Sequence, residues 1–147
     1  AVAMIAGSTG AVERAIEACK ARGAKRAMPL PVSVPSHCDL MRPAAEQFAA
    51  DIEAVGLKAP QIPLVQNVTA TAVADLEALK QNLLAQLYSP VRWVESMQWL
   101  GEQGVAGLVE CGPGKVLGGL NKRCLKGAAN YSLDTPDGLS ACLAALV

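Results

Sequence analysis

The sequence predicts an α/β fold, because segments with the apolar spacing of helices alternate with short apolar segments that are typical of strands. The composition suits a folded domain with an aliphatic core, since 52% of the 147 residues are hydrophobic and only 3% are aromatic. Glycines and prolines separate many of these segments, as they do at turns and at the ends of helices.

The first 34 residues predict a strand, a helix and a second strand. Apolar residues recur at helical spacing over residues 11–19, after Ser8-Thr9-Gly10 and before Gly23, which is a typical helix end. The apolar segments 2–6 and 24–34 are the candidate strands of this βαβ-like unit. Three prolines interrupt the second strand, so we expect it to run at a sheet edge or to leave the sheet near them: Pro29, Pro31 and Pro35.

A second helix is expected within residues 40–55, because apolar residues recur there at intervals of three and four. Its start is ambiguous. Ser36 and Asp39 have the spacing of a capping box, whereas Pro43 prefers the first turn of a helix that begins later. Either start places His37 at the mouth of this helix.

The remaining segments continue the alternation. Strands are expected at 61–68, 105–111 and 129–133. Helices are expected from Leu76 to Leu87 and at 91–103, 116–126 and 138–146.

The composition excludes several function classes. Thirteen basic residues balance thirteen acidic ones, so no nucleic-acid partner is expected. No apolar run reaches the roughly 18–20 residues of a membrane span, and the first residues lack the basic flank of a signal peptide, so we expect no membrane partner and a cytoplasmic location. The five cysteines are widely spaced, which predicts reduced thiols and no metal site.

His37 is the candidate for acid–base chemistry, because it is the only histidine and lies between a strand-like segment and a helix. A nucleophile is missing: the chain has no Gly-x-Ser-x-Gly motif, and the adjacent Cys38 is a poor partner for the ring. The glycine-rich segment 112–119 has the wrong spacing for a phosphate loop, since Val116 stands where magnesium needs a hydroxyl. A tight turn is favoured there.

Three segments resemble the bacterial malonyl-CoA:acyl carrier protein transacylases. They read L-P-V-S-V-P-S-H-C-D-L-M at 30–41, Q-L-Y-S-P-V-R-W at 86–93 and V-E-C-G-P-G-K-V-L-G-G-L-N-K-R at 109–123. The resemblance implies the C-terminal part of that enzyme. Residues 1–31 would end its ferredoxin-like small subdomain, and residues 32–147 would form the C-terminal half of its hydrolase-like parallel-sheet core.

The resemblance also implies an activity: a malonyl group passes from malonyl-CoA through a serine acyl-enzyme to the phosphopantetheine thiol of acyl carrier protein, in fatty-acid biosynthesis, without a cofactor. His37 matches the general base, and Gln86 matches the residue whose main-chain carbonyl orients it. Val34, Pro35 and Ser36 match residues that line the acyl pocket. The family's serine, its carboxylate-binding arginine and its Gly-Gln-Gly segment are absent, so the chain alone is expected to be incomplete and inactive.

Two alternatives remain open. One is an acyltransferase domain of a polyketide or fatty-acid synthase, and the other is a noncatalytic docking fragment. Basic residues cluster near the expected helix 116–126, where they either form a solvated surface or dock the acidic carrier protein. They are Lys115, Lys122, Arg123 and Lys126.

Overall fold

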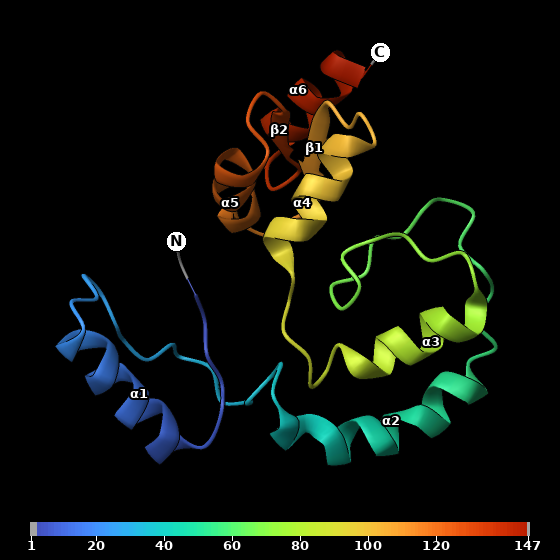
Figure 1. Cartoon of the computed structure of the whole chain (residues 1–147). Coiled ribbons are helices and arrows are strands. Elements are labelled where there is room, and N and C mark those ends of the chain that lie inside the picture. Colours follow the sequence, from blue (N-terminus) through green and yellow to red (C-terminus); the bar gives the residue numbers. More distant parts are fainter. Residues whose placement is uncertain (1–2, 147) are drawn as a thin grey trace. The chain divides into compact units, whose positions relative to one another are not determined.

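The computed structural model describes residues 3–146 and confirms the α/β class (Figure 1). The chain divides into two compact units between Val91 and Arg92. The boundary after residue 31, which the resemblance implies, concerns the subdomains of the family and stays a prediction. No helix in the described part of the chain is long and apolar enough to cross a membrane.

The first unit contains three α-helices and a short 3₁₀ helix: α1 at Thr9–Ala21, η1 at Asp39–Met41, α2 at Arg42–Ala54 and α3 at Leu76–Ala85. Helices α2 and α3 pack together, and their buried apolar residues include Ala45, Ile52 and Leu79. The Asp75 side chain caps α3 by accepting a hydrogen bond from the Ala78 N–H at 2.7 Å.

Lys80 joins these two helices through an ion pair. Its ammonium lies 2.9 Å from Glu53 of α2 and 3.1 Å from Glu77 of α3, and its side chain is only 13% exposed. The hydrogen bond to Glu53, followed by that to Glu77, raises the pKa of Lys80 above its ordinary value. Lys80 thus links α2 to α3 in addition to the apolar contacts between them.

The expected strand–helix–strand unit at the beginning of the chain is wrong in its strands. Only the helix forms: no strand is present at 24–34 or at 3–6, the part of the expected strand 2–6 that the structure describes, residue 2 lying outside the described residues. A strand needs a neighbour for its backbone N–H and C=O groups, and prolines remove several donors here. The chain bends instead, because Val32 N–H bonds to Leu30 C=O and Ser36 N–H bonds to Val34 C=O, each at 2.8 Å.

Two further expectations within this unit are resolved. The strand at 61–68 is reduced to one antiparallel bridge between Val65 and Ala72. The later start of the second helix is correct: α2 begins at Arg42 with Pro43 in its first turn, after η1.

The second unit is built on two parallel strands, β1 at Gly107–Glu110 and β2 at Ala129–Ser132. Helix α5 at Val116–Cys124 connects them and contacts both strands. Helix α6 at Pro136–Leu146 packs on β2, and α4 at Trp93–Glu102 packs on α5 (Figure 1). The strands and helices expected between 91 and 146 are thus confirmed; α6 begins two residues earlier than expected, and the other elements are shorter than expected.

Candidate active site around His37

The His37 backbone adopts a conformation that non-glycine residues rarely adopt. Its φ is +64°, in the left-handed region, which Ala70 also adopts; residues other than glycine are uncommon there, and strained ones cluster at functional sites. The His37 N–H donates to the Leu87 carbonyl at 2.9 Å, and the Cys38 thiol donates to the Pro35 carbonyl at 3.2 Å. These bonds hold the turn that carries the ring.

The imidazole ring is oriented by two main-chain carbonyls. Nδ1 lies 2.9 Å from the Gln86 oxygen and 3.2 Å from the Ser89 oxygen. A carbonyl oxygen only accepts, so both contacts require that Nδ1 carry the hydrogen. In the neutral ring, Nε2 is then unprotonated. Its lone pair is available to accept a proton.

These carbonyls are available because α3 ends beside them. Gln86 is the C-cap of α3, and the last carbonyls of a helix lack partners within the helix. The contact with Gln86 is the one that the resemblance implied. The contacts with Leu87 and Ser89 were missed, although Ser89-Pro90 marks the helix end that exposes them.

The predicted acyl-pocket residues directly precede His37 along the bent segment. Val34 is 49% exposed, Ser36 is exposed and Pro35 is half-buried. Their role in binding an acyl group stays a prediction, as does the role of His37 as a base.

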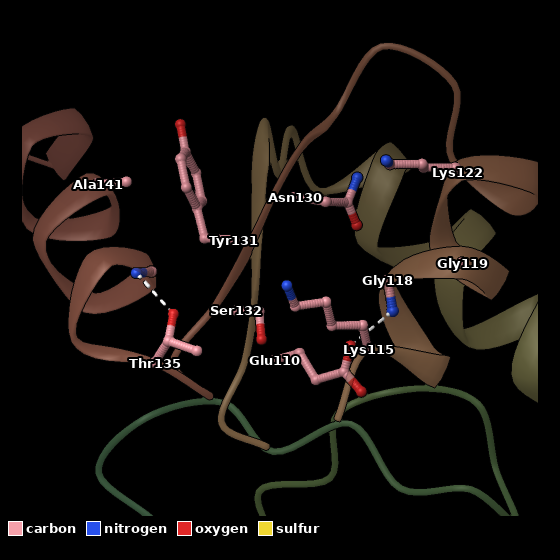
Figure 2. A pocket seen from close by; sticks show the side chains of 11 residues that line it. Glu110, Lys115, Gly118, Gly119, Lys122, Asn130, Tyr131, Ser132, Thr135 and Ala141 are labelled. Carbon is pink, nitrogen blue, oxygen red and sulfur yellow. Dashed lines mark hydrogen bonds between the residues drawn. The ribbon is translucent and has the colours of Figure 1, made fainter. Parts of the chain in front are cut away.

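The glycine-rich turn is held by carboxylates. Glu110, at the end of β1, accepts hydrogen bonds from the Leu117 N–H at 3.0 Å and from the Gly118 N–H at 2.8 Å. Figure 2 shows the bond to Gly118. The Asp134 side chain accepts from the Gly114 N–H at 3.1 Å. Since Glu110 occupies the N-terminus of α5, a phosphate cannot use those donors. The sequence interpretation as a tight turn therefore agrees with this geometry.

The basic residues around α5 differ in their placement. Lys115 is the N-cap, whereas Lys122 and Arg123 lie in the last turn. The helix ends at Cys124, so the expected helix to residue 126 is too long and Lys126 lies beyond it. The chain leaves the helical conformation at Leu125, with a φ of −124° and a ψ of 86°. All four basic residues are exposed.

A cavity of about 420 Å³ lies in the second unit, over β2 between α5 and α6 (Figure 2). Lys115 and Lys122 line it together with Glu110, Asn130 and Tyr131. His37 and the predicted acyl-pocket residues do not border it. No cluster of metal-ligating side chains occurs among the residues described by the structure.

No protein-family model matches the chain. Several individual proteins are similar to it in sequence. The malonyl CoA-acyl carrier protein transacylase of Salmonella typhimurium is 50% identical over 140 residues, which are 95% of this chain. The protein of the same name from Bacillus subtilis is 41% identical over 134 residues, or 91% of this chain. The expected family resemblance is confirmed.

Solved structures of the transacylases agree with the sequence comparison. A malonyl-CoA:acyl carrier protein transacylase from Xanthomonas oryzae has a TM-score of 0.91 and 45% identity over 95% of this chain. A malonyl-transacylase in complex with a type II PKS acyl-carrier protein has a TM-score of 0.90 and 47% identity. The match covers only 44–45% of those proteins. This chain therefore spans slightly less than half the length of the transacylases that it resembles.

Proposed function

We propose that these residues form part of an enzyme that transfers malonyl groups from malonyl-CoA to the phosphopantetheine thiol of acyl carrier protein in fatty-acid biosynthesis. In this proposal, His37 is the general base. The observation that carries it is the pair of carbonyls at Nδ1, because they leave Nε2 as the proton acceptor of the neutral ring. The sequence identity to transacylases supplies the reaction class.

The reaction then requires a serine from outside this chain. Nε2 takes the hydroxyl proton while the serine oxygen attacks the thioester carbon of malonyl-CoA. When the carbon–sulfur bond breaks, the imidazolium returns the proton to the departing CoA thiolate. The carrier-protein thiol reverses these steps on the acyl-enzyme. Because Nδ1 carries a hydrogen in both charge states of the ring, its bonds to Gln86 and Ser89 persist throughout.

The surface of the chain supports a role within a larger fold. Large apolar side chains remain exposed around the segment before His37, including Leu30 at 55% and Val32 at 65%. Apolar surface of this extent is typical of regions that contact further protein. Val34, Pro35 and Ser36 would line the acyl pocket within such an assembly.

The exposed basic residues around α5 are proposed to attract the acidic carrier protein. Positive charge near a docking site raises the association rate more than it raises the intrinsic affinity. A cytoplasmic location belongs to the same proposal. A carrier protein of polyketide synthesis is the second candidate partner, because one of the similar transacylases was solved with a type II PKS acyl-carrier protein.

A chimera would test the proposed function. In the Salmonella typhimurium transacylase, the matching 140 residues would be replaced by this chain, and malonyl transfer to acyl carrier protein would be measured. We expect His37→Asn to lower turnover about 10²–10⁴-fold, since it removes a general base. Asparagine is the better substitution because it tolerates a positive φ. Near-normal turnover of the variant would refute the assignment of His37.

The chain on its own provides a second arm of this test. Incubated with malonyl-CoA and weighed by intact mass spectrometry, it should gain no malonyl group, because it lacks the motif of the serine nucleophile. A covalent adduct on a residue of this chain would show that the nucleophile has been misplaced. An active chimera would argue against the noncatalytic docking fragment.

A further inference from the structure

A stacked arginine joins the two segments between which the His37 ring lies. The Arg42 guanidinium lies over the Tyr88 ring, with its central carbon 4.2 Å from the ring centroid. Asp39 holds the same guanidinium: Arg42 Nε donates to Asp39 Oδ1 at 2.9 Å, and Nη2 lies 2.8 Å from that oxygen. A planar guanidinium fixed in this way can stack on an aromatic face.

The positions of these residues relate the stack to His37. Asp39 and Arg42 follow His37 by two and five residues, in η1 and at the start of α2. Tyr88 lies between Gln86 and Ser89, whose carbonyls contact Nδ1. The stack is therefore a second connection between the segment that carries the ring and the turn that orients it.

We propose that Arg42 is a positioning residue for His37: by holding Tyr88, it keeps the Gln86 and Ser89 carbonyls at Nδ1 and thereby favours the tautomer with a free Nε2. The catalytic consequence of this proposal rests on the proposed function. The effect on the tautomer does not, because it depends only on contacts within this chain.

The site needs such a connection for two reasons. His37 is exposed, so packing does not restrain its ring. The acceptor carbonyls lie beyond the last residue of α3, a helix of only 10 residues, and helix ends fray. A cation–π contact at an exposed site changes a two-state population about two- to fivefold. An effect of this size is enough to change the fraction of rings that are ready to accept a proton.

The single histidine makes the tautomer measurable. In the 147-residue chain labelled with ¹⁵N-histidine, all ring signals come from His37, and the shifts of Nδ1 and Nε2 report which nitrogen carries the hydrogen. We expect Arg42→Met, which keeps an apolar stem, to lower the ratio of the Nδ1–H form to the Nε2–H form about two- to fivefold. Tyr88→Leu should have a similar effect, and the double variant should add little to either change.

Matched variants separate this role from general stability. Tyr88→Phe keeps the ring and should retain the wild-type spectrum. Lys20→Met removes a comparable exposed pair, with Glu17 three residues away on α1, and should also leave His37 unchanged. If Arg42→Met unfolds by circular dichroism, Tyr88→Leu removes the stack from the other side: the tautomer ratio should fall in Tyr88→Leu and stay unchanged in Tyr88→Phe, and an unchanged ratio in folded Tyr88→Leu would overturn the inference.

The inference would be overturned if folded Arg42→Met kept the wild-type tautomer ratio. It would also be overturned if the histidine spectrum of Tyr88→Phe matched that of Tyr88→Leu. In the chimera, Arg42→Met should lower kcat two- to fivefold while the KM for malonyl-CoA stays constant. If the proposed function is wrong, substitution of His37 will leave turnover unchanged while Arg42→Met still shifts the tautomer. The two failures are therefore distinguishable.

Discussion

Replacement of Glu110 by glutamine should destabilise the second unit selectively. The two carboxylate oxygens accept from the Leu117 and Gly118 N–H groups at 3.0 and 2.8 Å. Glutamine has one acceptor oxygen, so its NH₂ group faces the other N–H. The loss of one hydrogen bond to a charged group costs about 1.5–3 kcal/mol, and the lost charge at the helix N-terminus costs about 0.3–1 kcal/mol more.

Because Glu110 is only half-buried, we expect the lower part of that range, about 2 kcal/mol. For a unit of this size, the melting temperature should fall by about 8–16 °C. Both tryptophans of the chain, Trp93 and Trp99, lie on α4 of the same unit. Tryptophan fluorescence during urea unfolding therefore reports on the unit that contains the substitution.

The control is Glu102→Gln, at the exposed last residue of α4. A negative charge at a helix C-terminus is unfavourable, so this variant should be neutral or slightly stabilised, within about 0.5 kcal/mol. Coincident unfolding midpoints for the two variants would refute the assignment of Glu110 as the cap that holds α5.

Two pairs of substitutions test a helix cap and the space around two glycines. Asp75→Ala removes the N-cap of α3 and should lower the free energy of unfolding by about 0.5–2 kcal/mol. The control Asp51→Ala, on α2, should change it by less than about 0.5 kcal/mol. Urea unfolding followed by circular dichroism measures both. Gly138→Ala would place a Cβ atom against the Ser132 carbonyl oxygen, closer than van der Waals contact, and should cost about 1–3 kcal/mol. A Cβ atom at Gly119 would have no neighbouring atom within 4 Å, so Gly119→Ala should stabilise α5 by about 0.5–1 kcal/mol. A higher melting temperature for Gly138→Ala than for Gly119→Ala would contradict this reasoning.

The sequence predicted the helices better than the strands, because the two depend on contacts of different range. Helical spacing and local ends such as Pro43 are readable within a few residues. A strand requires a partner elsewhere. Residues 107–110 and 129–132 have one in each other, whereas 24–34 has none among the described residues. The apolar composition of 24–34 therefore indicated neither strand pairing nor burial within this chain, in which Leu30 is 55% and Val32 is 65% exposed.

The candidate site was predictable only in part. The sequence identified His37 because it is the single histidine, and the resemblance identified Gln86. The tautomer was not predictable, since it depends on carbonyls 49 and 52 residues away. The stack of Arg42 on Tyr88 was missed for the same reason: no local pattern reports a contact between residues that are 46 positions apart.

The positions of the basic residues in α5 show which of their charges stabilise the helix and which do not. Lys115 gives the clearest test of docking. Lys122 and Arg123 lie in the last turn, where positive charge stabilises the helix whether or not a partner binds. Lys115 is the N-cap, where positive charge is unfavourable, so helix stability does not explain it. Removal of its charge should therefore weaken docking without weakening the fold.

In the chimera, we expect Lys115→Gln to raise the KM for acyl carrier protein at low salt, while the KM for malonyl-CoA changes less and the melting temperature stays the same or rises. At high ionic strength the difference should shrink, since the Debye length falls to about 3 Å near 1 M salt. Lys58→Gln, an exposed lysine of the first unit, is the matched control. An equal KM for carrier protein in both variants at low salt would mean that Lys115 is simply a solvated surface charge.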